Sequence, residues 1–451
     1  MRKTSLYIFS VMLFSALQSC VKHPAEPGLG SLNINVMIEF SDSVKQYGLS
    51  LANAEIKLAN QWSNKENAGS TDATGAARFQ DVSAGKYNVS ATLTIKKDVF
   101  TAATGRLTEE DVTFNAVLPG VVLNNATNNT LRLALHGGEP GLLLIKQIYY
   151  AGSHTTNGAN YRDQFIEIYN NSSKVMYADS LYIMQVFGQT STNSDLASGY
   201  FVTSGALTGQ YDWNKSIGMP ADGKAVSDYV YAKSLYFIQG RGKDYPIQPG
   251  KSIVIAQTAI NHKAPYSSTT GGTITIKDPS LTIDLSDADF EVYLAPYLSV
   301  PLNSDVDNPS VPNLGVISYF GKDWLLDNPG RDAFAIFKTS VDVANLWKRY
   351  APPNVRSVTG ATTVYYQVPS SLVIDAVEIQ PNTSSSRVPK KMLGNLDAGF
   401  TFCPAGAFSS QSVIRKVARV TEDGRIILMD TNNSSNDFDY LDKADPRGFK
   451  Q

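Results

Sequence analysis

Aromatic side chains gather in one polar segment of the sequence, between residues 190 and 245. The segment is also rich in Gly, Ser, Asp and Asn, which favour turns and loops. Rigid aromatic rings in such a loop offer a large stacking area at a small entropic cost, as a surface that binds a sugar, a peptide or a protein requires. The aromatic residues of this insert are Tyr200, Phe201, Tyr211, Trp213, Tyr229, Tyr231, Tyr236, Phe237 and Tyr245.

Four of these residues are the candidates for contact with a ligand or a partner: Tyr211, Trp213, Tyr229 and Tyr231. Trp213 is the strongest, because its neighbours lack a sustained strand pattern and the indole is therefore expected near the surface. The alternative is that Tyr229, Tyr231 and Phe237 belong to a strand and pack into the core, as aromatic residues of β-proteins commonly do.

Few other side chains suggest a metal or haem site. His154 lies in a polar loop and could donate its imidazole to a metal or a haem iron, although a histidine in such a loop is more often solvated. Aspartates near residues 284–289, 305–308 and 437–439 could offer oxygen ligands to Ca²⁺, but none has the full spacing of an EF-hand loop. Turn formation explains them more simply, so we predict no metal site and no cofactor.

The sequence carries no pattern that points to catalysis. HExxH, GxSxG, P-loop, GxGxxG and CxxC motifs do not occur in a setting that gives them meaning. The 39 Lys and Arg residues are balanced by 41 Asp and Glu residues, so the composition gives no reason to expect nucleic-acid binding. We therefore expect a protein that is not an enzyme and has no nucleic-acid partner.

The N-terminus has the features of an export signal. Arg2 and Lys3 precede a mostly apolar run from Leu6 to Leu17, which is too short to cross a bilayer, since a spanning helix needs about 20 apolar residues. The sequence Leu17-Gln18-Ser19-Cys20 resembles the lipobox of bacterial lipoproteins, whose cysteine is acylated. This resemblance implies a signal peptide over residues 1–19, lipidation of Cys20 and attachment to a membrane through acyl chains.

The segment that follows Cys20 predicts a spacer. Residues 20–30 contain Pro and Gly without apolar periodicity, and we expect them to hold the folded body away from the membrane. With Cys20 acylated, Cys403 is the only other cysteine, so no intrachain disulfide is expected and stability must come from packing.

From Leu32 onward the sequence predicts short β-strands. Leu32–Phe40 and Ala54–Leu58 alternate with the period of two that marks a half-buried strand. Thr71–Ala91 resembles the repeat pattern of prealbumin-like, carboxypeptidase-regulatory-like sandwich domains, with a tight turn from Asp72 to Gly75 that requires a positive φ at Gly75. The resemblance implies a small antiparallel β-sandwich over residues 31–136. Its expected inward-facing residues are Phe79, Val82, Tyr87, Val89 and Ala91.

A Gly/Pro cluster at residues 136–141 predicts a domain boundary. After it, Leu142–Gly152 and Gln164–Asn171 resemble the opening of a lamin-tail-type, immunoglobulin-like sandwich. Ile247–Ala256 resembles a later hairpin of that fold, with its turn at Pro249-Gly250. The resemblance implies a larger domain over residues 141–451, elaborated by the aromatic insert.

The C-terminal part again predicts strands, at Ser371–Glu378, Ser412–Val417 and Arg425–Asp430. One helix is expected over residues 340–350, with Ser340 as its N-cap. Its expected apolar face consists of Val341, Ala344, Leu346, Trp347 and Tyr350. The fold class is thus all-β, a small sandwich followed by a larger one.

Taken together, these features resemble a family of outer-membrane lipoproteins of Bacteroidota-type bacteria (domain of unknown function 4876), whose members tend to be encoded beside TonB-dependent receptors. The resemblance implies an outer-membrane location, on either face. The leading hypothesis is a lipid-anchored, non-enzymatic accessory or ligand-capture protein that works with a TonB-dependent transporter in nutrient uptake. Its cargo could be haem or an iron complex, a glycan, a peptide or another small molecule. The alternatives are a structural or adhesive surface scaffold and, less favoured, a hydrolase.

Overall fold

The computed structural model describes residues 31–40, 48–61, 65–104, 111–125, 129–138, 143–339 and 341–450. The predicted signal peptide over residues 1–19, the lipidation site Cys20 and the rest of the spacer to residue 30 lie outside the described residues, as do Ser340 and residues 139–141 of the expected boundary. No helix in the described part of the chain is long and apolar enough to span a membrane.

The N-terminal strands form a seven-stranded sheet. They are β1 (Leu32–Phe40), β2 (Glu55–Asn60), β3 (Glu66–Ser70), β4 (Ala76–Val82), β5 (Gly85–Ile95), β6 (Val112–Leu123) and β7 (Thr130–Gly138), with the helix α2 (Lys97–Thr104) between β5 and β6. Their order across the sheet is β3-β2-β5-β6-β7-β1-β4. The strands β1 and β7 run parallel, and the other neighbours are antiparallel. Burial alternates along β1 as its sequence predicts.

The tight turn predicted between Asp72 and Gly75 is confirmed. The Asp72 carboxylate accepts hydrogen bonds from the backbone N–H groups of Thr74 (2.8 Å) and Ala76 (3.1 Å). Gly75 has a φ of +79°, and a Cβ atom there would lie 2.8 Å from the Ile38 carbonyl oxygen, so glycine is required. The predicted inward-facing residues are all buried: Phe79, Val82, Tyr87, Val89 and Ala91.

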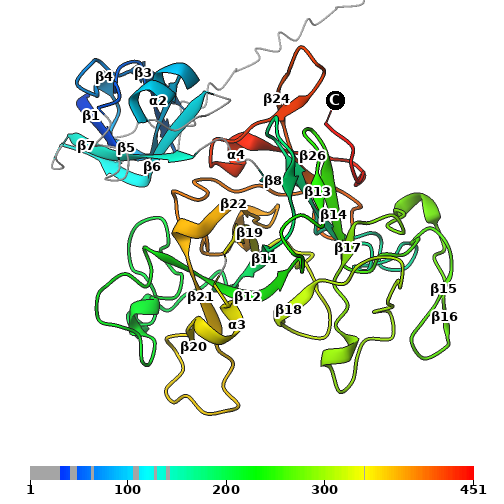
Figure 1. The fold of residues 1–451 in the computed structure, drawn as a ribbon. Helices are drawn as coiled ribbons and strands as arrows, with labels where there is room; N and C mark the ends of the chain where they lie inside the picture. The colour runs from blue at the N-terminus through cyan, green and yellow to red at the C-terminus, as the bar shows by residue number, and fades with distance from the viewer. Residues whose placement is uncertain are drawn as a thin grey trace, which may run out of the picture.

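Two larger sheets follow and share one hydrophobic core (Figure 1). The first has the order β17-β14-β9-β8-β23-β26 and consists of β8 (Leu143–Tyr149), β9 (Phe165–Asn170), β14 (Ser252–Ala256), β17 (Phe290–Glu291), β23 (Ser412–Arg415) and β26 (Phe438–Leu441). The second has the order β20-β21-β12-β11-β19-β22, with β18 beside β12. Its strands are β11 (Leu181–Val186), β12 (Tyr229–Phe237), β18 (Gly315–Ser318), β19 (Ala333–Lys338), β20 (Arg349–Tyr350), β21 (Tyr365–Pro369) and β22 (Val373–Glu378).

The remaining elements are short. They are the strand pairs β10 (Met176–Tyr177) with β13 (Pro246–Ile247), β15 (Tyr266–Ser267) with β16 (Thr273–Ile274) and β24 (Val417–Val420) with β25 (Ile426–Leu428), and the helices η3 (Pro279–Leu281), η4 (Ala295–Tyr297), η5 (Ser370–Leu372), η6 (Ser384–Ser386) and α4 (Ser434–Asp437). The chain is therefore all-β, as predicted. The boundary at 136–141 and the prealbumin-like and lamin-tail-like likenesses stay predictions.

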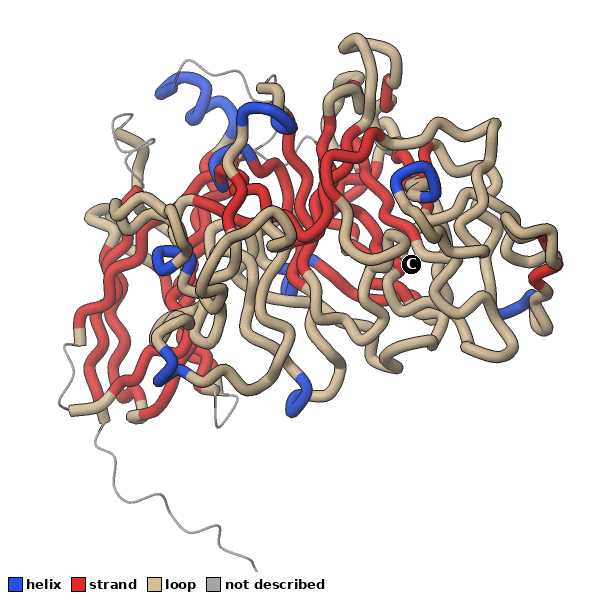
Figure 2. The backbone as a smooth tube through the Cα atoms, turned by 90° about the horizontal axis from the view of Figure 1, so that it is seen from below, coloured by secondary structure: helices blue, strands red, loops and turns tan. Residues whose placement is uncertain are grey.

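Several strands of the two large sheets are buried on both faces. In β11, Leu181 and Ile183 enter the core between the sheets, whereas Tyr182, Met184 and Val186 enter another core on the outer face. Figure 2 shows long loops wrapped around the strands, and residues of such loops complete the outer cores. This covering explains why β8, β9 and β11 are buried without interruption, a pattern that differs from the alternation of a half-buried strand.

The guanidinium of Arg415 joins the two sheets from within. Arg415 belongs to β23 of the first sheet, and its Nη2 donates to both carboxylate oxygens of Asp375, in β22 of the second sheet, at 2.7 and 2.8 Å. Its Nε donates to the Ile145 carbonyl oxygen of β8 at 3.1 Å. The backbone N–H of Ile145 also donates to Asp375, at 2.6 Å. The Arg415 side chain is only 1% exposed, so this contact is an interior one.

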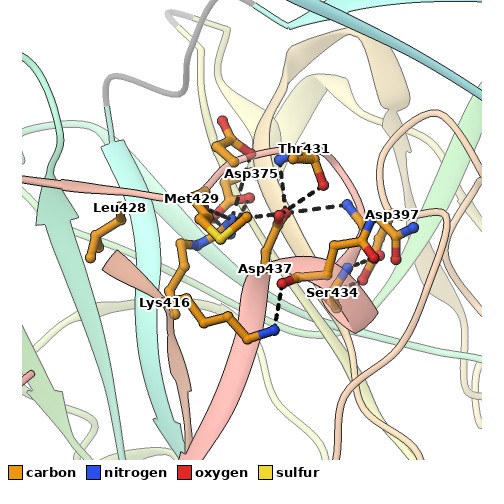
Figure 3. A network of polar contacts seen from close by, with 12 residues as sticks. Asp375, Asp397, Lys416, Leu428, Met429, Thr431, Ser434 and Asp437 are labelled. Atoms are coloured by element: carbon orange, nitrogen blue, oxygen red, sulfur yellow. Dashed lines mark hydrogen bonds and ion pairs between the residues drawn. The ribbon is translucent and has the colours of Figure 1, made fainter. Parts of the chain in front are cut away.

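The same network holds the C-terminal segment against the sheets (Figure 3). Asp437 lies 3.4 Å from the Arg415 guanidinium and accepts hydrogen bonds from the backbone N–H (2.9 Å) and the hydroxyl (2.8 Å) of Thr431. Asp397 accepts from the backbone N–H groups of Ser434 (2.8 Å) and Glu378 (2.7 Å), the latter in β22. The buried carboxylates of Asp437 and Asp397 thus hold the C-terminal segment to Arg415 and to β22.

The prediction of a helix over residues 340–350 is wrong in its extent. The helix α3 covers only Val343–Leu346, and the carboxylate of Asp342 caps its first turn. Two residues of the expected apolar face, Val341 and Leu346, are exposed. Tyr350 lies in β20, because the chain extends there to pair with β21 at the edge of the second sheet. Edge pairing therefore ends the helix early.

The predicted turn at Pro249-Gly250 forms, but it does not close a hairpin. The backbone N–H of Lys251 donates to the Gln248 carbonyl oxygen at 3.0 Å, and Gly250 has a φ of +71°. Before the turn β13 pairs with β10, and after it β14 pairs with β9 and β17. The turn thus leads the chain from a small strand pair into the first large sheet.

Replacing Gly75 with Ala should destabilise the protein more than replacing Gly48 with Ala. Both residues have positive φ, which costs a non-glycine residue about 1–2 kcal/mol. A Cβ at Gly48 would meet no atom of a described residue within 4 Å, whereas one at Gly75 would meet backbone at 2.8 Å. Urea denaturation gives the free energy of unfolding of each variant. Equal losses would contradict a steric role for the approach of Gly75 to β1.

Candidate functional site

The predicted aromatic insert combines loop segments with a strand of the second sheet. Its loop part contains the short helices η1 (Leu196–Ser198) and η2 (Trp213–Lys215). The Asp212 carboxylate caps η2 by accepting a hydrogen bond from the backbone N–H of Asn214 at 3.2 Å, which places Trp213 at the start of the helix. Tyr229, Tyr231 and Phe237 lie in β12, which confirms the alternative that they are strand residues.

The indole of Trp213 is buried, so the prediction that it lies near the surface is wrong. Only 4% of Trp213 is exposed. Its ring stacks on Tyr231, with centroids 3.6 Å apart and planes 9° apart. Phe187 and Tyr365 pack edge-on against it at 6.0 and 6.4 Å. These partners come from distant parts of the chain, so the residues next to Trp213 in the sequence gave no sign of its burial.

A column of stacked rings runs from this buried pair toward the surface. Phe187 lies 3.6 Å from Tyr365 and 5.8 Å from Tyr211, measured between ring centroids. Phe201 stacks on Tyr211 at 5.4 Å, and a β-bridge joins the backbones of these two residues. Tyr365 is buried, whereas the other three rings are half-buried. The insert therefore presents partly exposed rings supported by a buried aromatic base.

Tyr211 and Tyr229 are the two predicted candidates that remain partly exposed. Neither hydroxyl group makes a hydrogen bond to any described residue, and burial raises the pKa of Tyr211, which keeps its hydroxyl protonated. Tyr231, in contrast, donates to the Ala225 carbonyl oxygen (3.0 Å) and accepts from Gln367 (3.1 Å). Tyr211 and Tyr229 can thus contact a ligand, while Trp213 and Tyr231 support the site from below.

An open depression of about 600 Å³ lies where the start of the insert meets three other segments, at residues 329–331, 381–386 and 407. Hydroxyl and amide side chains dominate its lining. Among the described lining residues only Arg331 is charged, and it forms an ion pair with Asp327 at 2.6 Å, so this part of the lining carries no unpaired charge. The lining residues are Thr190, Ser191, Thr192, Pro329, Arg331, Pro381, Asn382, Ser385, Ser386 and Ala407.

Gln210 fixes the insert relative to the depression. Its Nε2 donates to the carbonyl oxygens of Pro389 and Lys390, both at 3.3 Å, and its Oε1 accepts from the backbone N–H of Gln189 at 2.6 Å. Gln189 precedes Thr190 on the rim, and Gln210 precedes Tyr211 in the aromatic column. One buried amide thus positions both features.

The sequence analysis did not find this depression. Its hydroxyl residues, such as Ser191 and Ser385, stand in short polar stretches that look like ordinary turns. The only available signal was the run Thr190-Ser191-Thr192 at the start of the aromatic insert. Nothing local indicated that this run meets the loop around Ser385.

The side chains considered as metal ligands make other contacts in the structure. Nδ1 of His154 accepts hydrogen bonds from the backbone N–H groups of Thr156 (3.1 Å) and Asn157 (3.2 Å). Asp284 accepts from the backbone N–H of Ser286 at 2.9 Å, and Asp437 serves the Arg415 network. Among the described residues, no three His, Cys, Asp or Glu side chains are arranged to hold a metal ion.

The described carboxyl groups with the most strongly raised pKa values lie in the interior, and none lines the depression. Burial raises the pKa of Asp323 to about 8 and the pKa values of Asp163 and Glu291 to about 7. Asp323 accepts hydrogen bonds from Gln257 Nε2 and from the backbone N–H of Trp324, both at 2.7 Å. These groups act as structural acceptors rather than as parts of the candidate site.

Comparison with known families identifies part of the chain. Residues 248–444 match the DUF4876 family, described as a protein of unknown function. The matched range contains β14, β19, β22 and β23, and so includes strands of both large sheets. The DUF4876 resemblance expected from the sequence is confirmed over this range, whereas its lipoprotein and outer-membrane attributes stay predictions.

Solved structures extend the likeness to most of the fold. A crystal structure of a DUF4876 family protein from Bacteroides thetaiotaomicron VPI-5482 is 23% identical in sequence, with a TM-score of 0.50 over 90% of this chain and 94% of that one. A structure from Bacteroides eggerthii DSM 20697, whose description proposes a role in cell adhesion, is 11% identical over 51% of this chain and 80% of that one, with a TM-score of only 0.14. No curated protein matches this chain. The first likeness shows a shared fold.

Replacing Asp323 with Asn should make stability less dependent on pH. Burial raises the pKa of Asp323 from 3.8 to about 8, so folding favours the protonated acid. Its contribution is fully present below pH 3.8 and is lost as the pH rises toward 8, by roughly 1 kcal/mol per pH unit. The new amide oxygen can keep the hydrogen bond from Trp324, and a flip of the Gln257 amide lets its Oε1, which has no partner among the described residues, accept from the new Nδ2, so the fold should be kept.

Urea denaturation at several pH values between 5 and 8 measures this effect. We expect the free energy of unfolding of the wild type to fall across this range and that of Asp323→Asn to fall less. Parallel curves for the two proteins would show that Asp323 is ionised in the folded state.

Proposed function

We propose that this protein is a lipid-anchored, non-enzymatic accessory protein of the outer membrane that captures a ligand for a TonB-dependent transporter. The single observation that supports ligand capture is the hydroxyl-lined depression, whose rim is tied through the hydrogen bond between Gln189 and Gln210 to the half-buried rings of the insert. The proposed outer-membrane location and lipid anchor rest on the sequence up to Cys20 and on the DUF4876 resemblance.

The chemistry of the depression favours a neutral carbohydrate as the cargo. Hydroxyl and amide groups both donate and accept hydrogen bonds, and each hydroxyl of a sugar likewise acts as a donor and as an acceptor. The partly exposed rings of Phe201 and Tyr211 can pack against apolar faces of sugar rings. Haem is a weaker fit, because its carboxylates need free cations and Arg331 is already paired with Asp327.

The size and support of the depression agree with this role. A volume of about 600 Å³ lies within the range of typical ligand pockets. Gln210 and the buried Trp213–Tyr231 pair hold the insert in place, so little ordering is needed on binding. The proposal therefore assigns Trp213 a supporting role and Tyr211 a role in contact.

Filling the depression should abolish carbohydrate binding. Ser385 is exposed on the lining, so Ser385→Trp should place an indole in the space that a sugar would use. Ser310, an exposed serine in another turn, gives the matched control Ser310→Trp. We would test the wild type on an array of neutral and acidic glycans and confirm hits by calorimetry. We expect neutral glycans to bind the wild type and Ser310→Trp, and at least tenfold weaker binding to Ser385→Trp and Tyr211→Ala.

Experiments in cells test the proposed membrane location and the proposed transporter partner separately. Cys20→Ala should release the protein from the membrane fraction and lower uptake of the bound glycan, while the purified variant binds normally. A TonB-dependent transporter should co-purify with the wild type. Failure of all glycans to bind, together with normal uptake in a strain that lacks the protein, would contradict ligand capture and favour a surface scaffold.

A further inference from the structure

A second open depression, of about 640 Å³, lies beside the C-terminal segment of the chain. Its walls come from the segment that follows β14, from residues 283–287 and from residues 443–447. Charged side chains line it, in contrast to the hydroxyl-lined depression. They are Lys263, Lys443, Arg447, Asp284, Asp287 and Asp445.

Several of these charges already have partners. Arg447 forms ion pairs with Asp287 (3.2 Å) and with Asp289 (3.0 Å) at the rim. Asp284 accepts hydrogen bonds from the backbone N–H (2.9 Å) and the hydroxyl (2.6 Å) of Ser286. Arg447 and these carboxylates therefore stabilise the walls and are not free to hold a ligand.

The two lysines of the lining, unlike Arg447, have no carboxylate partner among the described residues. Neither Lys263 nor Lys443 forms an ion pair with a carboxylate among the described residues, and Lys443 Nζ donates only to the Ser280 carbonyl oxygen. Burial, and then the positive charge of Lys263, lower the pKa of Lys443. Two ammonium groups from distant parts of the sequence thus repel each other across one depression. An anion between them would relieve this repulsion.

We propose that this depression binds the oxyanion of a small molecule, a carboxylate or a phosphate, between Lys263 and Lys443. A carboxylate or a phosphate can accept charge-assisted hydrogen bonds from both ammonium groups at once. The site is separate from the hydroxyl-lined depression, since the two share no lining residue. The proposal is therefore independent of carbohydrate capture.

The proposal carries a pH dependence with a defined sign. A bound anion stabilises the charged form of Lys443, so binding should take up protons at alkaline pH, and affinity should fall as the pH rises through the lowered pKa of Lys443. Ionisation of the buried Asp163, whose charge acts on Lys443, lowers the affinity in the same direction, because it adds negative charge. The charged groups that line the depression or act on Lys443 are Lys263, Arg447, Asp163, Asp278, Asp284, Asp287 and Asp445.

Calorimetric titration of the full chain with inorganic phosphate and with citrate tests the site. The variants are Lys263→Gln, Lys443→Gln and the double variant, and Lys243→Gln, an exposed lysine in another loop, is the matched control with the same change in charge. We expect at least tenfold weaker binding to the double variant and unchanged binding to Lys243→Gln. Among the described residues the Lys263 ammonium makes no hydrogen bond or ion pair, so Lys263→Gln separates binding from folding.

The two probes distinguish the sources of the oxyanion. Binding of citrate alone would assign an organic carboxylate, and binding of phosphate alone would assign a phosphate group. Binding enthalpies that change with the ionisation heat of the buffer at alkaline pH would confirm proton uptake. Equal binding to the wild type and the double variant, or no binding of either probe to the wild type, would overturn the proposal.

Discussion

The buried guanidinium of Arg415 is the interaction on which the arrangement of the two large sheets depends. It contacts β8 and β22 directly from its own position in β23, and Asp437 adds the C-terminal segment. A charge in the protein interior is tolerated only when its partners are in place, and loss of one partner costs several kcal/mol. The network therefore favours one relative position of the sheets over others that would bury a similar apolar area.

This fixed position explains how the chain can carry so many loops without losing its core. The outer faces of both sheets are covered by segments that return from the strand ends, which buries strands such as β11 on both faces. The surfaces that remain for binding are consequently made by loops held on a packed scaffold. The insert is built in the same way. The buried side chain of Gln210 and the stacked Trp213–Tyr231 pair set the position of half-buried rings such as Tyr211.

The sequence predicted those features that depend on neighbouring residues. The turn at Gly75 and the alternation along β1 follow from local rules, and the structure confirms both. The burial of Trp213 could not be foreseen in this way, since Tyr231 and Tyr365 reach it through sheet pairing. The early end of α3 has the same origin, because pairing of β20 with β21 overrides a helical pattern. Both depressions combine residues from distant segments, so their chemistry became visible only with the fold.

The stability of Arg415→Met tests the central role of this residue most directly. The substitution keeps much of the side-chain volume but leaves Asp375 and Asp437 buried without their counter-charge, so we predict a loss of roughly 3–5 kcal/mol in the free energy of unfolding by urea denaturation. Arg241→Met is the matched control, because this arginine is 91% exposed and pairs only with Asp244 at the surface, where little loss is expected. A loss in Arg415→Met no larger than that in Arg241→Met would contradict the conclusion that the buried guanidinium holds the two sheets together.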